Sequence, residues 1–148
     1  MSKEQIKSTE TRRNIYAVGE CLLDIIFKNS QPAAAVPGGS MLNSAVSLGK
    51  VGLSVHLISD LTHDRVADVI ISFLEKNGVS IKFINRYNEG KTAISLAFLD
   101  KSGDADYSFY KIYPKKRLTG EFPVVTDKDI VLFGSFYSLT SELRRPLV

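Results

Sequence analysis

The stretch PGGSMLNSAVSLGK, residues 37–50, joins a glycine turn to an amphipathic helix. Its apolar residues recur at intervals of three and four positions, shortly after the glycine pair. That spacing predicts a helix over 40–50, with Ser40 as its N-cap. A glycine pair before a helix allows a ligand to approach free backbone N–H groups closely. Residues 37–43 are therefore a candidate binding segment.

Strands and a second helix are predicted on either side of this segment. Apolar runs typical of buried strands occupy 15–18, 55–59, 81–84 and 130–133, and a helical pattern covers 64–76. Strands that alternate with helices indicate parallel βαβ units joined by right-handed crossovers. The predicted fold class is therefore α/β, with a Rossmann-like layered sheet.

A β-hairpin interrupts this alternation. Residues 92–99 and 107–113 are rich in β-forming and aromatic residues, and the turn-forming segment 100–104 separates them. A further helix start is predicted over 139–143, shortly before Val148. We therefore expect an α/β domain that carries a β-hairpin and is incomplete at its C-terminus.

The composition bounds the class of protein. Of the 148 residues, 44% are hydrophobic and 24% are charged, which is typical of one globular domain. The polar residues 1–13 are predicted to form a disordered tail. The net charge of +3 is spread along the chain, so no nucleic-acid partner is expected. The apolar runs are shorter than the ~18 residues of a membrane span, so no membrane partner is expected either.

Signatures of metal and nucleotide sites are missing from the sequence. Cys21 is the single cysteine, which excludes an internal disulfide and a Cys/His metal cluster and makes the cytoplasm the expected location. No Gly-x-Gly-x-x-Gly occurs, and 48–51 is not a Walker loop because Val51 stands where Ser or Thr would meet magnesium.

Two polar side chains accompany the glycine pair. Asp24 stands among apolar neighbours in 21–27, and Asn43 lies one turn inside the predicted helix. A carboxylate accepts hydrogen bonds from two vicinal hydroxyls and an amide adds a donor, so together with Gly38 and Gly39 they suit a polyhydroxylated ligand. Each also has an ordinary explanation: the glycines form a turn, Asp24 is a local acceptor, and Asn43 is a solvated helix residue.

These pieces occur in a familiar order. The segments GECLLD at 19–24, PGGSMLN at 37–43 and LGKVG at 48–52 together resemble the N-terminal half of the PfkB/ribokinase-family carbohydrate kinases, with the fructokinase-like branch the most similar. The resemblance spans about Asn14 to Leu147. One departure lies at 61–67, where only Asp64 matches the Gly-Asp-Asp pattern common in the family.

The resemblance implies transfer of the ATP γ-phosphoryl group to a sugar hydroxyl, on a ribokinase-like body with a β lid that often also forms a homodimer contact. It implies that 14–148 is the N-terminal part of the domain, with lid segments at about 25–36 and 91–113. The residues expected to hold the sugar are Asp24, Gly38, Gly39 and Asn43. Those expected to form the lid wall are Phe98 and Tyr110.

In this family the catalytic base and most of the ATP site belong to a Gly-Ala-Gly-Asp-type motif near the C-terminus, and the 148 residues do not contain it. We therefore expect no catalytic residue and no metal site in this chain, and we expect ATP and Mg²⁺ to be cofactors of the full-length family enzyme. The chain should supply a sugar-binding half without turnover.

Two alternatives stay open. The chain could be a short non-catalytic protein that binds a sugar or dimerises through its lid. It could also derive from a nucleoside kinase of the same family. Ser40, Met41 and Leu42 replace the smaller or basic residues of many relatives, so the sequence does not define the sugar beyond fructose or a related hexose.

Overall fold

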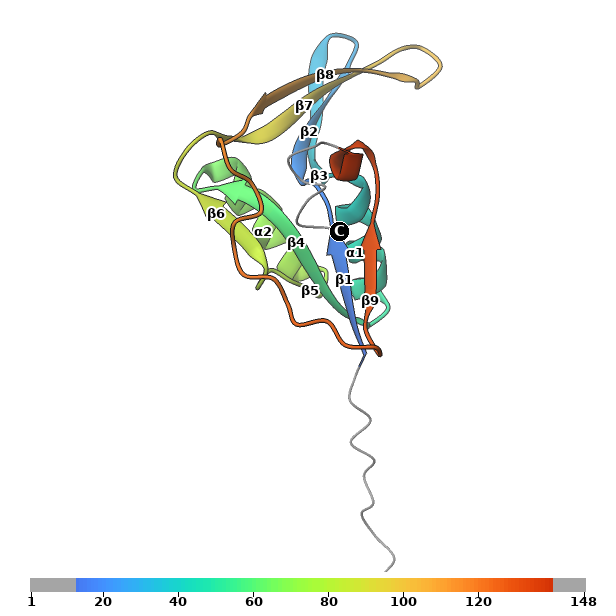
Figure 1. Cartoon of the computed structure of the whole chain (residues 1–148). Coiled ribbons are helices and arrows are strands. Elements are labelled where there is room, and N and C mark those ends of the chain that lie inside the picture. The colour runs from blue at the N-terminus through green and yellow to red at the C-terminus, as the bar shows by residue number, and fades with distance from the viewer. Residues whose placement is uncertain (1–12, 140–148) are drawn as a thin grey trace, which may run out of the picture.

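The computed structural model describes residues 13–139 and contains two β-sheets (Figure 1). The first, the parallel sheet, has strand order β5-β4-β1-β9, and β6 also pairs with β4. All of its pairings are parallel, which confirms the predicted α/β class. Its strands are β1 (Asn14–Val18), β4 (Ser54–Thr62), β5 (Val79–Ser80), β6 (Ile84–Tyr87) and β9 (Ile130–Phe133).

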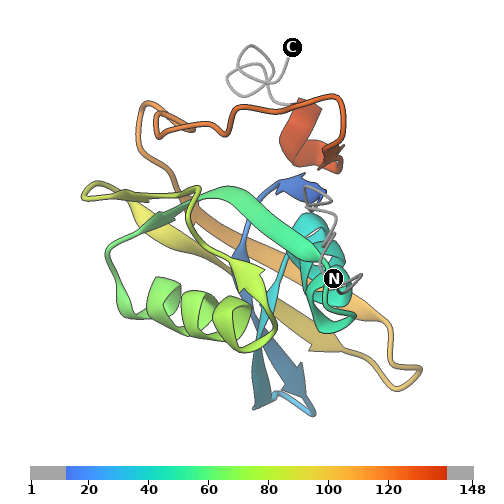
Figure 2. The same cartoon turned by 90° about the horizontal axis from the view of Figure 1, so that it is seen from below.

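Both helices cover one face of the parallel sheet (Figures 1 and 2). They are α1 (Ser40–Lys50) and α2 (Arg65–Lys76), and neither is long or apolar enough to cross a membrane. The other face carries the segment 113–129 and the short 3-10 helix η1 (Phe136–Leu139). The main core lies between helices and sheet because their apolar faces meet there; its fully buried large residues are Leu42, Leu57, Ile70 and Leu74.

The second sheet has four strands in the order β3-β2-β7-β8. Strands β2 and β7 are parallel, whereas the β2–β3 and β7–β8 pairs are antiparallel hairpins. This four-stranded sheet lies beyond the end of β1, from which the chain passes into it (Figure 1). Its strands are β2 (Leu22–Lys28), β3 (Gln31–Gly38), β7 (Lys91–Leu99) and β8 (Ala105–Ile112).

Both predicted helices and the β7–β8 hairpin are confirmed, but the structure differs from the sequence expectations elsewhere. Strand β3 was not predicted, because its proline and alanine residues lack the β-branched alternation of a typical strand. Its hairpin turn is formed by Asn29 and Ser30, with φ of 51° and 59°. Of the predicted strand 81–84, residues 81–83 instead form a turn between β5 and β6, closed by Ile84 N donating to Ile81 O at 3.0 Å, and only Ile84 belongs to a strand. The tail 1–12 and the helix predicted from 139 onward lie outside the described residues, save Leu139 itself.

Asp64 joins the two sheets. Its carboxylate caps α2 by accepting from Ala67 N at 2.9 Å, and it accepts from Thr92 N in β7 at the same distance and from the Thr62 hydroxyl. Partial burial raises the pKa of Asp64, but these hydrogen bonds outweigh burial and lower it to about 2. The ionised side chain therefore holds β7 beside the first turn of α2.

We expect this carboxylate to make folding stability depend on acid pH. Because the folded pKa of Asp64 is below its unfolded value of 3.8, its stabilisation is complete above pH 4 and is lost as the pH falls towards 2. Asn is also a good N-cap, but Asp64→Asn removes the charge that the Thr62, Ala67 and Thr92 donors stabilise. The change should lower the free energy of unfolding at pH 7 by about 1 kcal/mol and flatten this acid dependence.

Thermal unfolding between pH 2 and 7 measures both effects. Asp106→Asn, at an exposed position on β8, is the matched control and should retain the wild-type profile. An unchanged acid slope in Asp64→Asn would contradict the role given to this carboxylate.

Candidate functional site

The carboxylate of Asp24 is held in place by its neighbours in the four-stranded sheet. Asp24 pairs with Ser95 across β2 and β7, and the Ser95 hydroxyl donates a hydrogen bond to Asp24 Oδ1. Gly38 at the end of β3 faces the same carboxylate, since a β-carbon built there would overlap Asp24 Oδ2. Ser95 is fully buried and Asp24 only partly, so the carboxylate lies at the boundary between protein and solvent.

Gly39 brings this group to the start of α1. Its φ of 121° is in the region that favours glycine, and a β-carbon there would overlap the carbonyl oxygen of Glu20. Gly39, rather than the predicted Ser40, is the N-cap residue, and its carbonyl accepts from Asn43 N at 2.9 Å. The Asn43 side chain is exposed in the first turn. The structure thus places Gly38 and Gly39 beside Asp24, and Asn43 one turn farther along α1.

Three further side chains, those of Glu20, Phe109 and Lys111, belong to this site and were not singled out from the sequence. Lys111 Nζ, from β8, lies 2.7 Å from Glu20 Oε2, in the connection between β1 and β2. It also lies 5.0 Å from the ring centroid of Phe109, which is the cross-strand partner of Ser95. The signal that could have identified Phe109 and Lys111 is the register of the β7–β8 hairpin, which the sequence does not determine.

Phe98 and Tyr110 do not join Asp24. They were expected to form the lid wall, but the strand pairing puts Tyr110 opposite Ile94, next along β7 from Ser95, and therefore on the other face. Phe98 follows Ser95 by three positions and shares that other face, because successive strand residues alternate. Its ring stacks on Phe27 with centroids 4.8 Å apart. The aromatic rings of β8 on the Asp24 face are those of Phe109 and Tyr107, which stack with centroids 5.8 Å apart.

A buried ion pair anchors the chain that follows β8. The carboxylate of Asp60, at the end of β4, accepts from Tyr87 OH at 2.7 Å and from Leu118 N at 3.1 Å. Arg117 Nε lies 3.4 Å from Asp60 Oδ2, and only 6% and 3% of the two side chains are exposed. Its guanidinium stacks on Tyr113 at 3.7 Å. This contact limits how far β8, and with it Lys111, can move from the body.

Cys21 is not suited to nucleophilic chemistry. Its thiol is buried and donates to Ser59 Oγ at 3.3 Å. Burial raises the pKa of the thiol to about 12, which the Ser59 hydrogen bond offsets only in part. Within residues 13–139 there is also no group of three or more His, Cys, Asp or Glu side chains that could hold a metal ion.

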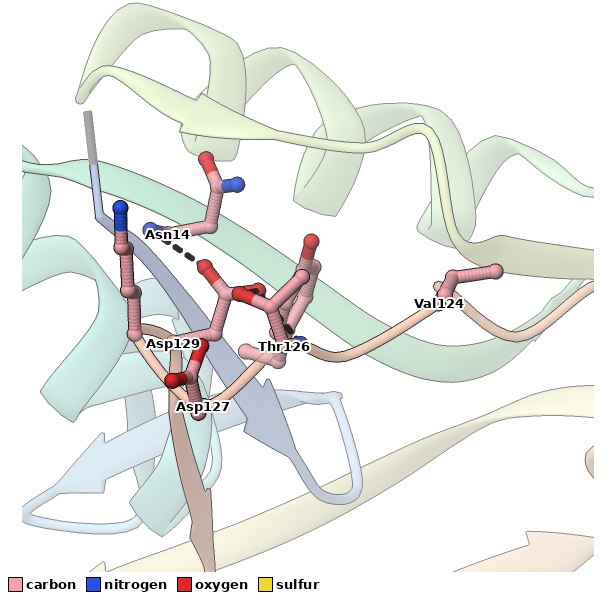
Figure 3. Close-up of a pocket in the computed structure, with 7 residues that line it drawn as sticks. Asn14, Val124, Thr126, Asp127 and Asp129 are labelled. Carbon is pink, nitrogen blue, oxygen red and sulfur yellow. Dashed lines mark hydrogen bonds between the residues drawn. The ribbon is translucent and has the colours of Figure 1, made fainter. Parts of the chain in front are cut away.

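A hollow lined by Asn14, Thr126 and Asp129 among others lies at the other end of the parallel sheet (Figure 3). Asp129 accepts from Asn14 N and from the backbone and hydroxyl of Thr126, each at 2.9 Å. These contacts stabilise the turn before β9, so the polar side chains that line the hollow have a structural role that requires no ligand. The site at Asp24 is the better candidate.

The fit between Gly38 and Asp24 can be tested by stability alone. Gly38→Ala should lower the free energy of unfolding by about 1–3 kcal/mol, since the added methyl group needs the space of the carboxylate. In the Asp24→Ala background the same change should have little effect, because the competing atoms are gone. Urea denaturation of the four variants gives the coupling energy, and additive effects would contradict the contact.

Several known proteins are similar to this chain over about two thirds of its length or more. Residues 12–146 match the pfkB family of carbohydrate kinases. The probable fructokinase-5 of Arabidopsis thaliana is 27% identical over 104 residues, which are 66% of this chain and 32% of that protein. The 2-dehydro-3-deoxygluconokinase of Haemophilus influenzae is 24% identical over 118 residues, which are 75% of this chain and 37% of that protein.

A crystal structure of fructokinase with bound ATP from Xylella fastidiosa matches with a TM-score of 0.59 and 27% identity, over 68% of this chain and 33% of that one. This confirms the ribokinase-like fold that the sequence predicted. The chain spans about a third of the length of these relatives. Since the family match extends over nearly the whole sequence, the chain belongs to the pfkB family of carbohydrate kinases.

Proposed function

We propose that this chain supplies the sugar-binding half and the lid of an ATP-dependent sugar kinase, which phosphorylates a hydroxyl of fructose or a related hexose. The observation that carries the proposal is the Asp24 carboxylate, oriented by Ser95 and lying against the Gly38–Gly39 turn. The names of two similar proteins support a sugar substrate, because one is a probable fructokinase and the other a kinase of a sugar acid.

The geometry suits a polyhydroxylated ligand for three reasons. An ionised Asp24 accepts hydrogen bonds from two adjacent hydroxyls, and the Ser95 contact fixes its orientation before the ligand arrives. The first turn of α1 has no side-chain cap, so its N–H groups are available to a ligand oxygen. Asn43 is exposed one turn away and offers both a donor and an acceptor.

The glycine turn of this chain is filled by neighbouring polar groups. Gly38 packs against the side chain of Asp24 and Gly39 against the carbonyl of Glu20, so this turn does not form an open phosphate loop. By resemblance to the family, we assign ATP, Mg²⁺ and the catalytic base to the part of the domain that relatives have beyond the matched region. The role proposed for this chain is to bind and orient the sugar.

The four-stranded sheet would act as the lid, with segments 25–36 and 91–113, and its face opposite Asp24 as a homodimer contact. That face carries Phe98, Tyr110 and Ile112, which are 40%, 56% and 62% exposed. Large apolar side chains gathered on one sheet face are typical of surfaces that meet a partner. A second copy of the chain would cover them.

Sugar binding is the direct test of the site. We expect fructose to bind the 148-residue chain with a Kd on the order of 1 mM, a free energy of about −4 kcal/mol, and to perturb the backbone NMR signals of Ser95 and residues 38–43. Asp24→Ala should abolish binding because it removes the acceptor for the hydroxyls. Asp106→Ala, on the other face of the same sheet, should bind as the wild type does. Equal binding by all three proteins would contradict the proposal.

Self-association tests the sheet face opposite Asp24 separately. Tyr110→Glu should shift a dimer to monomer in analytical ultracentrifugation, because a charge cannot be buried against the partner's apolar surface without a large free-energy cost. Val51→Glu, at an exposed position following α1, adds the same charge elsewhere and should leave the dimer intact. A monomeric wild type at high concentration would exclude the dimer.

A further inference from the structure

The charges at the candidate site are unequal. Glu20 and Asp24 contribute two carboxylates and Lys111 contributes one ammonium group, so these three side chains carry a net charge of −1. The buried Asp60 and Arg117 are paired with each other and add no net charge. Among the described side chains of the site, negative charge therefore exceeds positive charge although one of them is a lysine.

That lysine is already engaged. Its ammonium group lies 2.7 Å from Glu20 Oε2 and over the ring of Phe109. The side chains of Lys111 and Glu20 are 31% and 17% exposed, so the pair lies partly out of water and is less screened than a surface pair. The backbone of Glu20 is held in place because its carbonyl oxygen packs against Gly39, so the carboxylate can leave Lys111 only by rotation of the side chain.

We propose that the Glu20–Lys111 ion pair restricts this site to uncharged polyhydroxylated ligands and excludes sugars that carry a carboxylate. The proposal rests on the proposed sugar-binding function and names the substrate class of that site. It identifies Glu20 and Lys111 as specificity-determining residues.

The physical reason is the cost of the two alternatives for an acidic ligand. A ligand carboxylate that replaced Glu20 at Lys111 would leave Glu20 partly buried and unpaired, which is unfavourable. A carboxylate that left the pair intact would lie beside a group of side chains whose net charge is −1, and this repulsion disfavours its binding. An uncharged sugar meets neither cost, because its hydroxyls donate to Asp24 and leave the pair in place.

D-Fructose and D-gluconate, which are similar in size and differ in charge, distinguish the two classes. In NMR titrations of the full chain, fructose should bind the wild type at least about tenfold more tightly than gluconate, a ratio worth 1.4 kcal/mol. Glu20→Gln frees Lys111 and removes one carboxylate, so gluconate affinity should rise about tenfold while fructose affinity stays within about twofold.

Two controls separate this effect from a general change of charge or of fold. Adding Lys111→Met to Glu20→Gln keeps an apolar chain over Phe109 and should remove the gain for gluconate. Glu75→Gln, on the exposed surface of α2, changes the net charge equally and should alter neither affinity. Well-dispersed spectra of every variant show that each is folded.

The outcomes distinguish the inference from the function on which it rests. Fructose binding with no preference over gluconate, or no gain for gluconate in Glu20→Gln, overturns the specificity role while leaving the sugar site standing. Tighter binding of gluconate than fructose by the wild type also overturns it. If folded wild-type protein binds neither ligand, the proposed sugar site fails together with this inference.

Discussion

The close approach of Gly39 to the carbonyl of Glu20 is the constraint on which the rest of the structure depends. The chain leaves the parallel sheet after β1, forms the β2–β3 hairpin, and must return to the same place to begin α1. A β-carbon at Gly39 would collide with that carbonyl, and its φ of 121° suits no other residue well. The same contact brings the start of α1 to Asp24, so the candidate site follows from the packing of the fold.

Two carboxylates at the end of β4 complete this arrangement. Asp64 binds the backbone of Thr92 at the beginning of β7, and Asp60 binds the backbone of Leu118 shortly after β8. The β7–β8 hairpin is thus anchored at both ends to the parallel sheet, although its strands pair only within the other sheet. Because Phe109 and Lys111 lie on this hairpin, their position above Asp24 depends on contacts well outside the site.

The charge of the site bears on which class of sugar it binds, which membership of the family does not determine. Relatives that match this chain carry the names of kinases for fructose and for a sugar acid, at similar levels of identity. Sequence identity near 25% does not distinguish them, whereas a lysine already paired with a glutamate has a definite electrostatic consequence. The same family scaffold can select different ligands through a few charged side chains at the rim of the site.

The sequence by itself determined the elements whose signals are local. The helix after the glycine pair, the α2 pattern, the alternation of strands and helices, and the segments around Asp24 and Asn43 could all be predicted, because periodicity, caps and turn residues act over a few positions. Strand β3 could not be predicted, since an alanine-rich and proline-rich strand is stabilised by pairing with β2 rather than by its own β-propensity.

Only the tertiary structure decided which aromatic residues face Asp24. One position along a strand exchanges the two faces of a sheet, so the register of β7 and β8, which long-range pairing sets, placed Phe109 and Lys111 at the site and turned Phe98 and Tyr110 away from it.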